Sequence, residues 1–123
     1  MLPINEIRVG NALSMNGKNF VLSQDLFSEI LSEPQLLDKI KPVLVTEEVL
    51  IKAGFESLDE PGGWALQHVF VYKVYYEDQV FYEVHFVKEF EDRVTLPQRI
   101  KFVHKLQNLY FEVTGIELPC KLD

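Results

Sequence analysis

The chain has 123 residues, 47% of them hydrophobic and 25% charged, a composition typical of one globular domain. Its 19 acidic and 12 basic residues give a net charge of −7, which disfavours binding to nucleic-acid phosphates. The sequence has one cysteine, no apolar run of about 20 residues and no basic segment followed by an apolar core at its start. We therefore expect a cytoplasmic protein with no internal disulfide and no membrane span.

The first third of the chain predicts a small β-hairpin followed by a helix. Within residues 7–23, the pair Asn16 and Gly17 is typical of a type I′ turn between two short apolar strands. Ser23 is expected to cap a helix over residues 24–31, which carries its apolar side chains on one face.

A second short helix is expected after Thr46. This residue can cap the helix through its hydroxyl, and the acidic residues Glu47 and Glu48 in the first turn complement the helix dipole. Gly54 follows at the expected end of the helix, where a left-handed residue is favoured.

Residues 65–89 carry the clearest strand pattern, because apolar and aromatic side chains alternate through two runs. A turn at residues 77–79 would pair Lys73 with Glu83 and place the even-numbered aromatic residues on one face. We expect that face to support the helix at the end of the chain.

That last helix is predicted within residues 96–118. Thr95 suits the N-cap, Pro97 suits the first turn and Gly115 suits the end. Its main apolar arc contains Phe102, Val103, Leu106, Leu109, Tyr110 and Val113. The fold class expected for residues 1–123 is therefore a single α+β domain: an antiparallel sheet packed by a long C-terminal helix, with an N-terminal hairpin and one or two shorter helices.

A side stripe of mixed character lies next to the main arc of this helix, at Ile100, His104, Gln107 and Phe111. One interpretation is that a loop or the C-terminal tail covers these residues. The other is that they form a contact site for a protein partner, since polar groups beside an aromatic anchor are typical of modest, specific interfaces. These four residues are our candidate partner-binding site.

The sequence points to no catalytic residue, cofactor or metal site. His68, His85 and His104 lack the close spacings that metal sites use, and Cys120 has no histidine near it in the sequence. There is no glycine-rich phosphate loop. The carboxylates at residues 47–48 and at Glu89, Glu91 and Asp92 are interpreted as solvated charges.

Three blocks resemble a family of small uncharacterised proteins from Bacteroides-group bacteria and their phages. Residues 8–11 (RVGN) resemble its opening R-I-G-N, and residues 42–50 (PVLVTEEVL) with Gly54 and Phe55 resemble P-I-P-L-T-E-E-x-L…G-F. Residues 102–118 (FVHKLQNLYFEVTGIEL) resemble Y-V-H-Q-L-Q-N-L-Y-F…T-G-x-E-L, although Lys105 stands where glutamine is usual. The blocks cover about half the chain, and the resemblance implies a phage or mobile-element setting without implying an activity.

The function expected from these observations is a non-enzymatic protein-binding or adaptor module that contacts another protein or a second copy of itself. The alternative is a nucleic-acid-binding protein that uses the N-terminal β unit, with Arg8, Lys18 and Lys41 as phosphate contacts. A small hydrolase is the third class considered.

Overall fold

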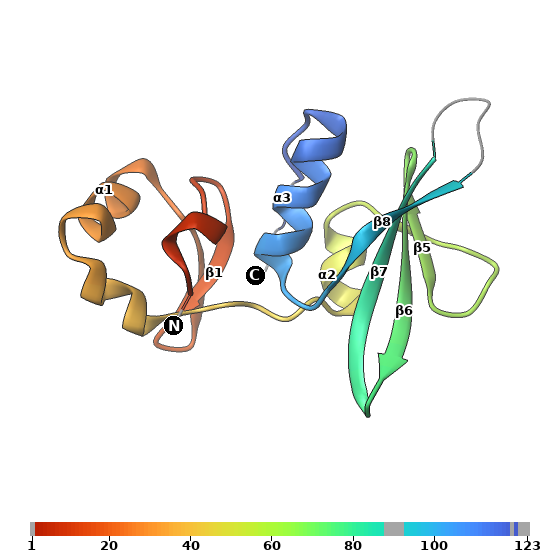
Figure 1. Ribbon diagram of the computed structural model, residues 1–123, viewed down its shortest axis with the longest axis horizontal. Helices are drawn as coiled ribbons and strands as arrows, with labels where there is room; N and C mark the ends of the chain where they lie inside the picture. The colour runs from red at the N-terminus through yellow and green to blue at the C-terminus, as the bar shows by residue number, and fades with distance from the viewer. Residues whose placement is uncertain (1, 88–92, 119, 121–123) are drawn as a thin grey trace. The chain divides into compact units, whose positions relative to one another are not determined.

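The computed structural model describes residues 2–87, 93–118 and 120. Helices and antiparallel sheets together confirm the α+β class (Figure 1). The chain groups into two compact units, one formed by Met1–Leu44 with Phe102–Asp123 and the other by Val45–Lys101. The expectation of a single domain over residues 1–123 stays a prediction.

The first unit has a three-stranded antiparallel sheet in the order β2-β1-β3. The predicted hairpin is confirmed. Asn16 and Gly17 have φ angles of 53° and 80°, and they connect two antiparallel strands in which Met15 pairs with Lys18 beside the turn. The elements of this unit are η1 (Ile4–Glu6), β1 (Ala12–Met15), β2 (Lys18–Val21), α1 (Gln24–Ser32), η2 (Pro34–Lys39), β3 (Ile40–Lys41) and α3 (Val103–Thr114).

Local caps fix the helix ends of this unit as the sequence predicts. The hydroxyl of Ser23 accepts a hydrogen bond from the amide of Leu26 at 3.1 Å and so begins α1. Gly115 ends α3 at φ 73°, and its amide donates to the carbonyl of Phe111 at 2.7 Å.

The core of the first unit lies between its sheet, α1 and the 3-10 helices. Buried apolar side chains from these elements and from the residues beside them pack together at Leu2, Ile7, Leu13, Leu22, Ile30, Leu37 and Ile40. The helix α3 contacts β1, a packing partner that the sequence analysis did not assign to it. Val103, Leu106 and Tyr110 are buried, as expected for members of the main apolar arc.

The second unit is a five-stranded antiparallel meander in the order β4-β5-β6-β7-β8 with one short helix. Thr46 caps this helix by accepting from the amide of Val49 at 3.2 Å, as predicted. The elements are α2 (Glu47–Lys52), β4 (Glu56–Ser57), β5 (Gly63–Leu66), β6 (Val69–Tyr76), β7 (Gln79–Val87) and β8 (Arg93–Ile100).

The predicted register of the long hairpin is wrong by one residue. Tyr76 pairs with Gln79 across a two-residue turn, so Lys73 pairs with Tyr82 instead of Glu83. A shift of one residue sends one strand's side chains to the other face. The buried face therefore combines odd-numbered residues of β6 with even-numbered residues of β7, namely Val69, Val71, Tyr82 and Val84.

The predicted start of the last helix is also wrong, because residues 93–100 form β8 and α3 begins only at Val103. The edge of β7 provides backbone partners for this segment, with Ile100 paired to Tyr82 and Arg99 to Glu83. Pro97, interpreted as a first-turn residue, is compatible with this position because β8 is the last strand of the sheet and an edge strand tolerates a missing amide donor.

The turn of the long hairpin gives a stability prediction. Glu77 and Asp78 have φ angles of 49° and 64°, a left-handed conformation that costs non-glycine residues free energy and that Asn-Gly adopts readily. The double substitution Glu77→Asn with Asp78→Gly should stabilise the protein by about 1 kcal/mol in chemical denaturation. Placing the same Asn-Gly pair at Asp59 and Glu60, neither of which has a positive φ, should give no such gain. A loss of stability in the first variant would contradict the turn geometry.

Candidate interaction surface

The four residues proposed as a binding stripe do not form one exposed surface. Ile100 ends β8 in the second unit and is 3% exposed, whereas the other three lie on α3. His104 and Gln107 are 0% and 2% exposed, and only Phe111, at 44%, is open to solvent. The predicted stripe is wrong because the helix begins after Ile100. In addition, the side of α3 that carries Gln107 faces the N-terminal segment. Partner binding through Phe111 stays a prediction.

The side-chain amide of Gln107 joins α3 to two other segments of the first unit. Its oxygen accepts from the backbone amide of Ala12 at 2.8 Å and from Asn11 Nδ2 at 3.4 Å. Its nitrogen donates to the carbonyl oxygens of Gly10 at 3.1 Å and Leu118 at 3.4 Å. Both ends of the amide are therefore satisfied, which a buried polar group needs in order to be stable.

The neighbouring residue Asn108 extends this polar network. It accepts from Asn11 Nδ2 at 2.9 Å and donates to the carbonyl of Glu6 at 2.8 Å. The carboxylate of Glu6 also pairs with Lys105 at 2.7 Å. Asn108 and Lys105, which lie outside the main apolar arc of the helix, thus contact the N-terminal segment.

Arg8 connects the network to the surface. Its Nη1 forms an ion pair with Glu117 at 2.7 Å, and its Nη2 donates to the carbonyl of Gln107 at 3.2 Å. Its Cζ lies 4.7 Å from the centre of the Phe111 ring, within the range of a cation–π contact. The guanidinium is therefore held by a carboxylate and a carbonyl, and it covers one aromatic ring.

Gly10 permits the Glu117 carboxylate to lie close to the backbone beside Arg8. Its φ of +100° is unfavourable for a side chain, and a Cβ built there would lie 3.0 Å from Glu117 Oε1. A larger residue would displace the carboxylate that holds Arg8.

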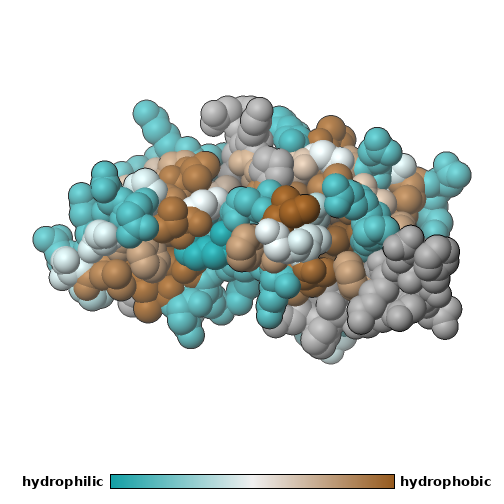
Figure 2. All heavy atoms as spheres, turned by 90° about the horizontal axis from the view of Figure 1, so that it is seen from above, coloured by the Kyte–Doolittle hydropathy of each residue, from teal (hydrophilic) through white to brown (hydrophobic). Residues whose placement is uncertain are grey.

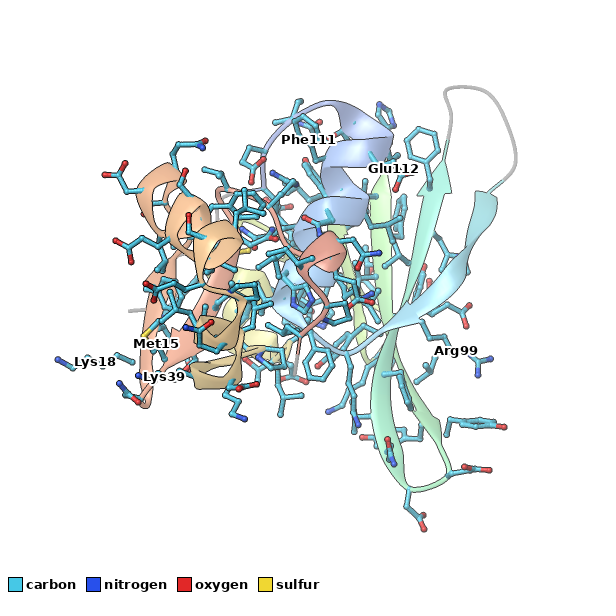
Figure 3. The ribbon with its side chains drawn as sticks, turned by 60° about the vertical axis from the view of Figure 1, so that its left-hand side comes forward. Met15, Lys18, Lys39, Arg99, Phe111 and Glu112 are labelled. Carbon is cyan, nitrogen blue, oxygen red and sulfur yellow. The ribbon has the colours of Figure 1, made fainter. Side chains whose placement is uncertain are left out.

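We define the Phe111 surface as Arg8, Val9, Phe111, Ile116 and Glu117. Val9 and Ile116 are exposed and flank the ion pair in the chain, while Phe111 lies under the guanidinium. Figure 3 shows Phe111 and Glu112 on the C-terminal turns of α3. On the face of the molecule drawn in Figure 2, apolar residues are interspersed with hydrophilic ones.

Parts of the three blocks that resemble the family lie in the first unit, whereas residues 45–50, Gly54 and Phe55 of the second block belong to the second unit. Residues 8–11 and 107–118 supply the network described above, and the carbonyl of Val43 accepts from the amide of Val103 at 2.7 Å. Leu44 bridges to Phe102 next to it. The sequence analysis missed the role of Arg8 in this arrangement, because its partner Glu117 is 109 residues away and no local pattern signals the pairing.

His104 is a buried imidazole without a hydrogen-bond partner for either ring nitrogen among the described residues. Its ring stacks on Phe102 at 6.0 Å and 15°. Burial lowers the pKa of His104, the charge of Lys105 lowers the pKa further, and the carboxylate of Glu6 partly opposes both effects. Folding therefore favours the neutral form of the His104 ring.

Other groups with catalytic potential are not assembled into a site in the part of the chain that the structure describes. Within it, no three His, Cys, Asp or Glu side chains converge to hold a metal ion. Cys120 is buried, and burial together with Glu117 raises the pKa of its thiol to about 12, so it is protonated at neutral pH. Glu89, Glu91 and Asp92 lie outside the described residues.

A second exposed aromatic area lies on the long hairpin of the second unit. The β5 pairing ends at Tyr72 and the β8 pairing ends at Tyr82, so residues 73–81 extend as a two-stranded ribbon. Tyr75 and Tyr76 are 71% and 54% exposed. The guanidinium of Arg99, whose side chain is labelled in Figure 3, lies 5.6 Å from the centre of the Tyr76 ring.

The ribbon is joined to the rest of its sheet by a charged cluster. The carboxylate of Glu83 lies 2.8 Å from Nε2 of His85 and 3.5 Å from Nε of Arg99 on the neighbouring strand. Tyr72 meets the His85 ring edge-on at 5.2 Å. These contacts connect β6, β7 and β8 on one face.

Comparisons with protein-family models, curated proteins and solved structures gave no match to this chain. Of the helices within the described residues, none has the length and apolar character needed to span a bilayer.

The buried amide network gives a second stability prediction. Gln107→Ala removes the acceptor of the Ala12 amide and a donor to the Gly10 carbonyl, so it should destabilise the protein by about 2–4 kcal/mol in urea unfolding. Glu112→Ala, on the same helix but exposed, should change stability by about 0.5 kcal/mol or less. Equal effects of the two substitutions would show that the network contributes nothing.

The buried histidine gives a prediction of pH dependence. Because the pKa of His104 is lowered on folding, the unfolded state binds a proton first as pH falls through about 6.5. Stability should therefore be full above about pH 7 and decrease as the pH falls from about 7 to about 5.5. His104→Leu should flatten the curve over this interval. Parallel curves for wild type and His104→Leu would contradict the prediction.

Proposed function

We propose that this chain is a non-enzymatic protein-binding or adaptor module that acts in the cytoplasm, with the Phe111 surface as its contact site. The phage or mobile-element setting is part of the proposal and rests on the resemblance of the three sequence blocks. A separate protein or a second copy of the chain can occupy such a surface.

The observation that carries this proposal is an exposed aromatic ring held in a fixed position. Phe111 is 44% exposed, and Arg8 covers it while bonded to Glu117 and to the carbonyl of Gln107. Aromatic and arginine side chains contribute much of the binding energy at interfaces. A pre-organised pair loses less conformational entropy on binding than two mobile side chains do.

The surroundings of Phe111 have the composition of a small interface. Val9 and Ile116 add exposed apolar area, the carboxylate of Glu117 pairs with Arg8, and the exposed residue Glu112 follows Phe111 in the chain. An apolar centre with a polar rim is the usual arrangement of protein interfaces.

The geometry supports the nucleic-acid alternative less than it supports protein binding. Arg8 is bonded to Glu117, so it is not free to contact a phosphate. Ser14 pairs with Lys41, and its neighbour Met15 pairs with Lys18, so the two lysines lie on opposite faces of the sheet. A single phosphate backbone would not meet all three cations on one face.

The test is capture of partners from the native host followed by direct binding measurements with the purified partner. Phe111→Ala should abolish binding while lowering stability by no more than about 1 kcal/mol, because the side chain is half exposed. Tyr75→Ala removes an exposed ring from the ribbon of the second unit and serves as the matched control, which should bind like wild type.

Two results would contradict the proposal. One is a folded Phe111→Ala variant that binds the partner with wild-type affinity. The other is capture of nucleic acid alone, with binding that weakens steeply as salt is raised. Sedimentation of the wild-type chain over a concentration series identifies the case in which the partner is a second copy.

A further inference from the structure

The C-terminal end of α3 combines apolar area with negative charge. Phe111 and Ile116 are exposed, and Arg8 is neutralised by its ion pair with Glu117. Glu112 lies next to Phe111 in the chain, is exposed, and forms no ion pair among the described residues. The charges of Arg8, Glu117 and Glu112 therefore sum to −1.

Two further features make the potential at this surface more negative. Helix α3 ends at Thr114, and the carbonyl groups of its last turn form the negative end of the helix dipole. The chain as a whole carries a net charge of −7, whose field extends beyond any single pair and attracts cationic partners.

The aromatic anchor itself is suited to a cation beside an apolar side chain. One approach to the Phe111 ring is taken by Arg8 at 4.7 Å, and 44% of the residue is still exposed. An arginine or lysine can place its apolar stem on such a ring while its charged end reaches a nearby carboxylate or helix C-terminus.

We infer that the Phe111 surface takes a basic peptide segment of a partner protein, one that inserts an aliphatic or aromatic anchor against Phe111 and Ile116. The cationic side chains of that segment lie towards Glu112 and the C-terminal end of α3. This inference rests on the proposed function, because it specifies the partner chemistry of the same site. Charge complementarity selects a basic segment over an acidic one or a nucleic acid, both of which carry the same sign of charge as the chain.

The experiment uses the full chain to select binders from a random peptide library, followed by affinity measurements on synthetic copies of the selected peptides. The selected peptides should carry net positive charge and one large apolar residue. Their affinity should fall several-fold as ionic strength is raised from about 50 mM to about 500 mM. Phe111→Ala should abolish their binding.

A pair of charge reversals separates the local surface from the net charge. Glu112→Lys should weaken binding about tenfold, whereas Glu29→Lys on α1, which changes the net charge equally at another exposed position, should weaken it by about twofold or less. Equal losses in the two variants would overturn the inference, because the binding would then follow total charge alone.

The remaining outcomes test the basic-partner inference and the proposed function separately. Enrichment of neutral or acidic peptides that require Phe111 overturns the basic-partner inference and leaves the proposed function standing. Peptides that bind Phe111→Ala as tightly as wild type, or no enrichment at all, overturn the inference. A native partner that also binds independently of Phe111 removes the proposed function as well.

Discussion

The buried amide of Gln107 is the interaction on which the arrangement of the first unit depends. It lies on α3 and is bonded to backbone groups at Gly10, Ala12 and Leu118, so helix, N-terminal segment and C-terminal tail meet at one side chain. An amide without partners in the interior costs free energy, and the cost is avoided only when all three segments are in place together. The position of each segment therefore depends on the other two.

The exposed surface follows from this buried network. Gln107 fixes the backbone at Gly10 and Ala12. Because Arg8 lies only two residues before Gly10, its backbone position is defined as well, and its side chain reaches Glu117 and Phe111. A guanidinium shared between a carboxylate, a carbonyl and a ring has little freedom to move. The half-exposed ring of Phe111 is thus a consequence of packing below it, and this link from interior to surface is what supports a binding role.

In the second unit, the arrangement of the long strands depends on a different feature, the turn of the long hairpin. The two-residue turn at Glu77 and Asp78 sets which side chains of β6 and β7 share a face. That choice buries Val71 with Val84 and leaves Tyr76 exposed near Arg99. Strand register and surface chemistry are consequently fixed by the same local geometry.

Signals that act within a few residues were readable from the sequence. Side-chain caps and left-handed glycines span at most a turn of helix, so their residue types suffice to place them, as at Asn16, Gly17, Ser23, Thr46, Gly54 and Gly115. Phe111 was also identified as a candidate contact residue, because helical periodicity set it apart from the main apolar arc. Helix and strand content, and with it the α+β class, followed from these signals.

The tertiary structure decided the features that depend on a distant partner. Residues 93–100 carry both a helix-start signal and an alternating pattern, and pairing with β7 selects the strand. The turn at Glu77 and Asp78 has no Asn-Gly signature, so its length, and hence the faces of two strands, could not be read from residue types. Whether Gln107 is exposed or buried is settled by Ala12, 95 residues away, because a polar side chain can be buried only where the folded chain supplies its hydrogen bonds.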